Sequence, residues 1–219
     1  MAVESAGHIQ TAASPLRKHR APEIAECVAC GRDVWIFGYG SLMWDPGFAY
    51  SEARSALLRG YHRSFCVYST QYRGTPERPG LVLGLDRGGA CRGIAFRVPA
   101  ADVEAALHYL WEREMGHGTY RLREVSLETA EGTVRARAFV VDRKMPHYAG
   151  RLSLDETVRL IFQGIGGRGS CRQYLENTVC ELKKLGLIDG PMHRLEERVR
   201  ELAAREMPCA SAAMPREIR

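Results

Sequence analysis

The sequence has no long hydrophobic segment. In its 219 residues no apolar run approaches the roughly 20 residues that a membrane-spanning helix needs. Residues 1–33 contain no continuous apolar stretch after the first charges, so we expect no secretory signal peptide. Hydrophobic residues make up 45% and charged residues 26% of the chain, as in ordinary globular proteins. This composition excludes a coiled coil, a collagen-like chain and a wholly disordered chain, and it predicts a globular protein with no membrane partner.

Lysine is missing from residues 34–99, which hold eight arginines and four acidic residues. The whole chain has 31 basic and 26 acidic side chains and a formal net charge of +5. This surplus is too dilute for a nucleic-acid-binding surface, which usually has a dense basic stripe with aromatic residues between its charges. We therefore expect no nucleic-acid partner, and a small anionic substrate suits the balance better.

The seven cysteines lack the spacing of a structural zinc site. Cys27 and Cys30 form one Cys-x-x-Cys pair, whereas such a site needs four ligands and usually two pairs. The histidines lie at no spacing typical of a metal site or of a catalytic triad. We expect no bound metal and no other cofactor, and seven reduced thiols in a cytoplasmic protein.

The chain divides into a central domain and two tails. Residues 1–33 are polar and show no sustained hydrophobic period, so we expect them to form a poorly ordered tail. A single domain follows at 34–205, and residues 206–219 form a second tail.

Strand patterns come first in the domain and helical patterns come mostly later. β-branched and aromatic runs predict a strand from Val34 and further strands at 57–69, 80–98 and 132–142, with a glycine-rich turn at Asp86–Gly89. Hydrophobic spacing predicts four helices. The first covers 101–114, and the second begins at a capping box formed by Ser153 and Glu156. The third covers 172–185 and ends at a C-terminal cap at Gly186, and the fourth begins at Pro191. This order predicts an α+β fold with a sheet curled around a small site.

A Gly-Tyr-Gly turn ends the first strand, at Gly38, Tyr39 and Gly40. Two glycines let the backbone bend sharply, so amides around Ser41 can point into a pocket and hold an oxyanion or a carboxylate. A hairpin turn with glycines that only pack is the alternative, because such turns are common.

Glu114 is the acidic residue with the most unusual predicted surroundings. The apolar face of the 101–114 helix runs through Val103, Leu107 and Leu110, and steps of three and four bring Glu114 onto it. Burial and the negative end of the helix dipole both disfavour its charge, so we predict a raised pKa, as a general base near neutrality needs. A salt bridge to a core arginine such as Arg121 is the alternative, and the spacing does not decide between them.

Gly164–Gly169 matches the letters Gly-x-Gly-x-x-Gly. The dinucleotide-binding motif requires these glycines after a strand and at the start of a helix, whereas here they follow a predicted helix. We interpret them as a glycine-rich loop before the next helix and as one wall of a pocket.

Five segments, taken in chain order, resemble the ChaC family of γ-glutamylcyclotransferases, in its branch associated with glutathione. The resemblance runs from about Val34 to Leu187. The segments are V-W-I-F-G-Y-G-S-L-M-W at 34–44, Tyr72–Pro76 with Pro79 and Gly80, Tyr109–Met115 with Tyr120, Pro146–Tyr148, and Tyr174 with Leu175.

The resemblance implies a mixed, barrel-like sheet flanked by helices. It implies a reaction in which the γ-glutamyl α-amine attacks its own side-chain amide, releasing 5-oxoproline and, from glutathione, cysteinylglycine. The family's catalytic glutamate falls on Glu114. The implied substrate-binding residues are Ile36, Phe37, Gly38, Tyr39, Gly40, Ser41 and Leu42, with Arg73 and Tyr148 at further substrate-side positions.

Two alternatives to glutathione cyclotransfer stay open. The same chemistry can act on other γ-glutamyl amino acids or amines, and the scaffold can serve a non-catalytic binding or regulatory protein. The sequence does not specify the oligomeric state.

Overall fold

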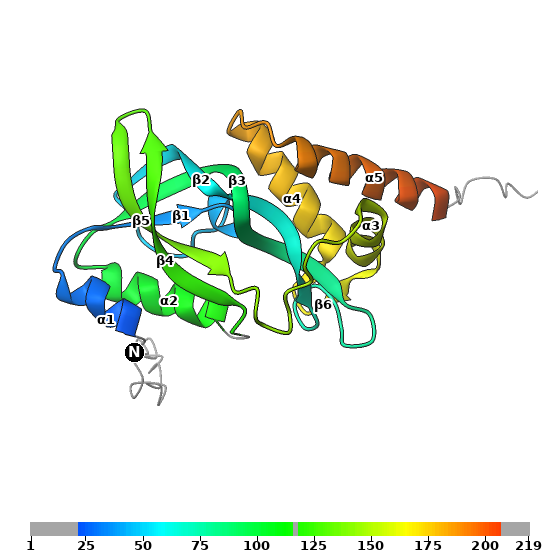
Figure 1. Ribbon diagram of the computed structural model, residues 1–219, viewed down its shortest axis with the longest axis horizontal. Helices are drawn as coiled ribbons and strands as arrows, with labels where there is room; N and C mark the ends of the chain where they lie inside the picture. The colour runs from blue at the N-terminus through cyan, green and yellow to red at the C-terminus, as the bar shows by residue number, and fades with distance from the viewer. Residues whose placement is uncertain (1–21, 116–117, 207–219) are drawn as a thin grey trace, which may run out of the picture.

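The computed structural model describes residues 22–115 and 118–206, and its centre is a closed five-stranded barrel (Figure 1). The strands are β1 (Val34–Gly38), β2 (Glu52–Ser69), β3 (Gly80–Val98), β4 (Tyr120–Thr129) and β5 (Gly132–Val141). Their order is β1-β3-β2-β4-β5, with antiparallel neighbours except for the parallel pairing of β1 with β5 that closes the barrel. The predicted mixed, barrel-like sheet is confirmed.

The predicted turn at Asp86–Gly89 is wrong, because β3 runs through these residues without a break. The pairing register shifts between Arg59 and Tyr61, so Gly60 stands opposite Gly88 and Gly89 in a bulge. All three glycines have positive φ, at 82°, 103° and 69° respectively, a region that other residues rarely adopt. The glycines therefore bend two long strands and do not end them. β4 was not predicted at all.

Two helices lie beneath the barrel in Figure 1, α1 (Pro22–Ala29) and α2 (Val103–Met115). The apolar face of α2 buries Val103, Leu107 and Leu110 as expected, and burying such side chains stabilises the fold by about 1.5–3 kcal/mol each. The expectation of a poorly ordered tail up to residue 33 is wrong for α1, which buries Ile24 and Cys27 against the same layer. The rest of that tail, residues 1–21, lies outside the described residues.

Three helices cover another side of the barrel, α3 (Leu154–Gln163), α4 (Cys171–Lys184) and α5 (Gly190–Glu206). The predicted capping box of α3 is confirmed, since the Ser153 hydroxyl accepts from the Glu156 amide and Glu156 accepts from the Ser153 amide. Gly186 follows α4 with φ 65°, as a C-terminal cap requires. The second expected tail lies outside the described residues after Glu206.

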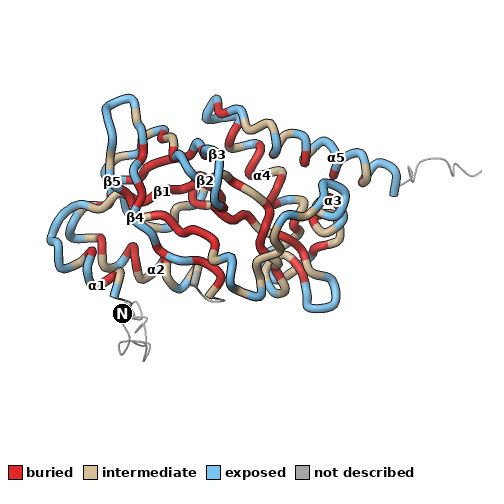
Figure 2. Tube along the Cα trace, viewed as in Figure 1, coloured by how far each residue is buried: buried red, intermediate tan, exposed pale blue. Residues whose placement is uncertain are grey.

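Buried residues are concentrated in the barrel strands and along the inward faces of α2, α4 and α5 (Figure 2). Two short elements complete the fold: the 3-10 turn η2 (Ser41–Met43) and a small hairpin of β6 (Ile165–Gly166) and β7 (Gly169–Ser170). No helix in the described part of the chain has the length and apolar character to cross a membrane.

Candidate active site

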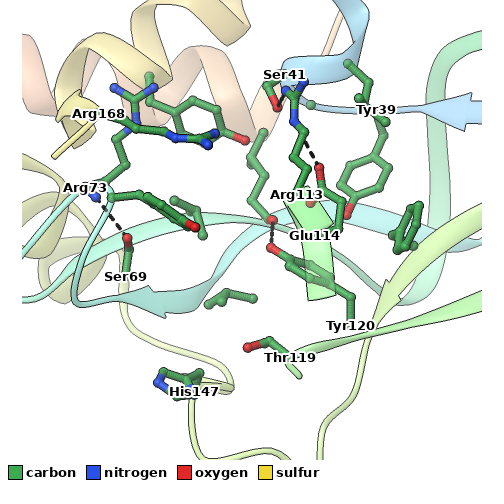
Figure 3. Close-up of a pocket in the computed structure, with 18 of the residues that line it drawn as sticks. Tyr39, Ser41, Ser69, Arg73, Arg113, Glu114, Thr119, Tyr120, His147 and Arg168 are labelled. Atoms are coloured by element: carbon green, nitrogen blue, oxygen red, sulfur yellow. Dashed lines mark hydrogen bonds and ion pairs between the residues drawn. The ribbon is translucent and has the colours of Figure 1, made fainter. Parts of the chain in front are cut away.

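A pocket of about 240 Å³ lies where η2, the end of α2, the β6–β7 hairpin and α4 meet the barrel. Glu114 and Tyr120 point toward its centre, with Ser41 and Arg113 beside them, Arg73 and Arg168 on another side, and Thr119 and His147 farther along (Figure 3). Segments far apart in the sequence thus supply one set of polar side chains.

Glu114 is held in the pocket by the last turn of α2, and its side chain is 19% exposed. Burial raises the pKa of its carboxyl, and the nearby charges of Arg113 and Arg168 oppose this rise without cancelling it. The predicted raised pKa is confirmed. The alternative of a salt bridge to a core arginine is also confirmed, but with Arg113 as the partner at 3.4 Å; Arg121 was the wrong partner, because it pairs with Asp142 at 2.6 Å.

Arg113 is the charged partner of Glu114. Its Nε lies 3.4 Å from Glu114 Oε1. The same guanidinium donates from Nη2 to Ser41 Oγ at 2.7 Å and from Nη1 to the Asp45 carbonyl and the Tyr109 hydroxyl, both at 2.9 Å. One side chain therefore connects the carboxylate on α2 to the turn that follows β1.

A second arginine, which is buried, also donates a hydrogen bond to the turn after β1. Arg63 is 1% exposed, and its Nε donates to the Tyr39 carbonyl. Asp189, between α4 and α5, balances this charge at 2.6 Å. Because Arg63 is fixed in the barrel wall, the position of Tyr39 follows from the packing of the whole domain.

The substrate segment implied by the family resemblance divides at the end of β1. Tyr39, Gly40, Ser41 and Leu42 line the pocket. Ile36 and Phe37 are strand residues buried in the two hydrophobic clusters, and Gly38 packs against Phe96. The structure does not bring Ile36, Phe37 or Gly38 to the pocket.

Three buried tyrosines surround Glu114: Tyr39, Tyr120 and Tyr174. Burial raises the pKa of each phenol, and the charge of Glu114 adds to the effect. They therefore remain neutral at physiological pH. Tyr120 donates its hydroxyl proton to the Leu83 carbonyl at 2.8 Å, which fixes its ring at the pocket floor.

Arg73 and Arg168 bring two further positive charges into the pocket. The Arg73 guanidinium lies over the Tyr174 ring at 5.2 Å and donates to the Ser170 carbonyl at 3.2 Å. The Arg168 guanidinium lies over the Tyr72 ring at 4.6 Å. Neither arginine has a carboxylate partner within 4.0 Å among residues 22–115 and 118–206.

The glycine-rich segment at 164–169 explains how Arg168 reaches the pocket. It follows α3 and forms the β6–β7 hairpin, whose Gly167 and Arg168 amides donate to the Gln71 and Tyr72 carbonyls at 2.8 and 2.9 Å. A side chain at Gly166 would place its Cβ 2.6 Å from the Gln71 carbonyl oxygen. The glycines thus permit close backbone contact, and the expected role as a pocket wall is confirmed.

Tyr148 is not in this pocket. Its hydroxyl donates to Asp86 Oδ2 at 2.9 Å, in a second cavity on another face. The preceding residue, His147, lines the pocket instead. The two side chains diverge because the segment pairs with β2 at Val67, where successive residues point to opposite sides.

The Cys-x-x-Cys pair lies on and just after α1, with Cys27 buried and Cys30 exposed. Within residues 22–115 and 118–206 no group of three or more His, Cys, Asp or Glu side chains is placed to hold a metal ion. His117 lies outside the described residues.

Residues 34–202 match the family model described as ChaC-like protein. The chain belongs to the ChaC-like family.

The ChaC-like chain has relatives with more specific names. It is 38% identical over 195 residues to a glutathione-specific gamma-glutamylcyclotransferase of Escherichia coli (strain K12), covering 87% of this chain and 84% of the relative. It is 38% identical over 147 residues to glutathione-specific gamma-glutamylcyclotransferase 1 of Mus musculus, covering 65% of this chain and 66% of the relative. A crystal structure of a γ-glutamyl cyclotransferase specific to glutathione from yeast superposes with a TM-score of 0.72. It covers 78% of this chain and 96% of the yeast chain at 22% identity, which shows a shared fold.

Several pocket residues of this ChaC-like chain were missed by reasoning from sequence. Arg113, Thr119, His147 and Arg168 carried no distinguishing local signal. Arg113 is adjacent to Glu114, and a helix places adjacent residues about 100° apart. Only its long side chain, folded back toward Ser41, brings its charge to the same site.

Proposed function

We propose that this protein is a γ-glutamylcyclotransferase that degrades glutathione to 5-oxoproline and cysteinylglycine. The observation that carries the proposal is Glu114, a carboxylate of raised pKa that shares one pocket with the Tyr39–Leu42 turn and with Arg73 and Arg168. The names of its relatives supply the substrate.

Glu114 is the general base in this proposal. Its carboxylate takes a proton from the α-ammonium of the γ-glutamyl group, and the freed amine attacks the γ-carbonyl carbon. The enzyme provides no nucleophile, since the attacking atom belongs to the substrate. Holding the amine against the carbonyl can supply an effective molarity on the order of 10⁵ M or more.

The tetrahedral intermediate requires donors for its oxyanion. Amides of the Tyr39–Leu42 turn are suited to this role. The first amides of η2 have no carbonyl within the same helical turn to which they can donate, so they are available to the substrate. Collapse breaks the bond between the γ-carbon and the cysteinyl nitrogen. One of the three ammonium protons stays on the lactam nitrogen and two end on the leaving nitrogen, so Glu114 is regenerated as a carboxylate.

Arg73 and Arg168 can bind the negatively charged carboxylates of the substrate. Glutathione has two carboxylates, and Arg73 and Arg168 bring two guanidiniums that have no carboxylate partner among the described residues. Guanidinium groups bind carboxylates through two parallel hydrogen bonds where geometry allows. We assign these arginines to substrate binding.

We also place the reaction in the cytoplasm. The six cysteines in the described part of the chain are all unpaired, which suits a reducing compartment.

The test is incubation of the purified protein with reduced glutathione, without metal or nucleotide, and detection of both products by mass spectrometry. Glu114→Gln should lower turnover at least about 100-fold, because an amide cannot accept the proton. Glu112→Gln, an exposed change on the same helix, is the matched control and should retain activity.

The outcomes separate the alternatives. Turnover of other γ-glutamyl amino acids but not of glutathione would reject glutathione as the substrate and keep cyclotransfer as the reaction. Glutathione binding without product supports a binding protein. Near-normal turnover by Glu114→Gln removes Glu114 as the base.

A further inference from the structure

A second cavity of about 770 Å³ shares no lining residue with the Glu114 pocket. It lies between β2 and β3, the segment from Arg143 to Leu154, and the helices α3 and α5. Its volume falls within the roughly 300–1,000 Å³ typical of small-molecule sites. We call it the arginine groove, after four of its lining residues: Arg87, Arg143, Arg151 and Arg194.

The arginine groove has one acidic lining residue, Asp86, and its carboxylate accepts three hydrogen bonds from neighbouring groups. Asp86 Oδ1 accepts from Arg143 Nε at 2.7 Å and from the Arg87 amide at 2.8 Å. Asp86 Oδ2 accepts from the Tyr148 hydroxyl at 2.9 Å. Asp86 and Arg143 therefore neutralise each other in the groove wall.

Three positive charges in the groove are left without a counter-charge. Arg87, Arg151 and Arg194 are exposed, and none has a carboxylate partner in the described part of the chain. They come from β3, from the segment before α3 and from α5, so they do not reflect a basic run in the sequence. Three like charges around one cavity repel one another, and a bound anion relieves that repulsion.

The remaining walls indicate the kind of anion. Guanidinium groups are forked donors matched to the oxygens of phosphate and carboxylate groups. The Ser64 hydroxyl offers an additional donor, whereas the Thr157 hydroxyl already donates its proton to the Ser153 carbonyl at 2.9 Å. Phe65, Met192 and Leu195 are buried and form an apolar floor against which a carbon skeleton can lie.

We propose that the arginine groove binds a small multivalent oxyanion, of the polyphosphate or polycarboxylate class, at a site separate from the Glu114 pocket. The proposal does not depend on the cyclotransferase reaction, which makes no use of the groove. One segment, residues 147–149, connects the two sites, and we call it the strap. Its Tyr148 lines the groove and its His147 lines the Glu114 pocket. Hydrogen bonds of 2.8 Å from the Tyr68 amide to the His147 carbonyl and from the Ala149 amide to the Cys66 carbonyl hold this strap on β2.

The test is isothermal titration calorimetry of the full chain with pyrophosphate and, separately, with citrate, at constant ionic strength and with a chelator present. We expect saturable binding of at least one of them at one anion per chain. The triple variant Arg87→Gln/Arg151→Gln/Arg194→Gln should weaken binding at least tenfold. These side chains are exposed, so circular dichroism should show an unchanged fold. Whether pyrophosphate, citrate or both bind identifies the phosphate or the carboxylate class.

Two controls make the result specific. Arg59→Gln/Arg121→Gln/Arg135→Gln removes the same charge from exposed positions outside both cavities and should retain binding. Arg73→Gln/Arg168→Gln removes the arginines of the Glu114 pocket and should also retain it. The proposal is overturned if neither anion binds saturably, if the groove variant binds like the parent chain, or if either control loses binding to the same extent.

Discussion

Arg113 Nη2 donates a hydrogen bond of 2.7 Å to Ser41 Oγ and so joins α2 to the turn after β1. Arg113 Nε also lies 3.4 Å from the Glu114 carboxylate. The Arg113 guanidinium therefore links the proposed base directly to the turn that carries the proposed oxyanion donors. A change of about 1 Å in such a distance can cost roughly 100-fold in rate.

Replacing Arg113 should separate its geometry from its charge. Arg113→Lys keeps the charge but loses the fork that reaches Ser41 and Asp45 together, so kcat should fall on the order of tenfold or more while KM changes less. Arg113→Gln loses both the charge and the fork, so its kcat should be lower than that of Arg113→Lys. Steady-state kinetics with glutathione measures both, and kcat within twofold of the parent for both variants would contradict this role.

The pH dependence of kcat/KM should show the surroundings of Glu114. The base must be ionised, so activity rises with pH as Glu114 loses its proton. Burial raises its pKa, and the acidic limb should therefore lie above the ordinary glutamate value of about 4.3. Arg113 favours the ionised form, so Arg113→Gln should move the limb to still higher pH, whereas Arg113→Lys should leave it near that of the parent.

The same shift can be measured without turnover. Titration of the Glu114 carboxyl by ¹³C NMR in the free protein should give a higher pKa in Arg113→Gln than in the parent. An unmoved titration in Arg113→Gln would show that the arginine does not act on Glu114.

Gly166 and Gly167 should respond differently to alanine. A Cβ at Gly166 would lie 2.6 Å from the Gln71 carbonyl oxygen and 2.7 Å from the Gly74 amide nitrogen, so the hairpin must shift. We expect Gly166→Ala to lower the free energy of unfolding by about 1–3 kcal/mol and to raise KM by displacing Arg168. A Cβ at Gly167 meets its nearest atom at 3.5 Å, so Gly167→Ala is the matched control. Urea unfolding and glutathione kinetics measure both effects, and equal effects of the two changes would contradict the packing argument.

Asp189 should matter to stability through Arg63. Asp189→Asn leaves a guanidinium that is 1% exposed without its counter-charge, and we expect a loss on the order of 3 kcal/mol in the free energy of unfolding. Asp155→Asn breaks the exposed pair with Arg198 and should have no resolvable effect. Urea denaturation of both variants tests this, and a stable Asp189→Asn chain would mean that water or a rearranged side chain replaces the carboxylate.

Local patterns were sufficient for α2, α3, α4 and α5 and for Glu114, but not for α1, which lies in a segment expected to be a tail. The apolar face of α2, the capping box at Ser153 and the cap at Gly186 depend on residues within one or two turns of each other, so the sequence determines them directly. The raised pKa of Glu114 follows from the same periodicity, because a residue on an apolar stripe is buried wherever that stripe packs.

Tertiary structure alone decided which charges meet. Arg168 reaches the pocket because Gly164 and Gly166 allow their segment to lie against the backbone of residues 71–74. Tyr148 turns away because its segment pairs with Val67. The pairing of β2 with β3 likewise made the glycines at 86–89 a bulge where their local pattern predicted a turn. These contacts join residues far apart in the chain, and hydrophobic periodicity contains no information about such pairs. The sequence by itself determined most of the helices and strands and the proposed base, whereas α1, β4, the unbroken β3 and the charges around Glu114 emerged only in the tertiary structure.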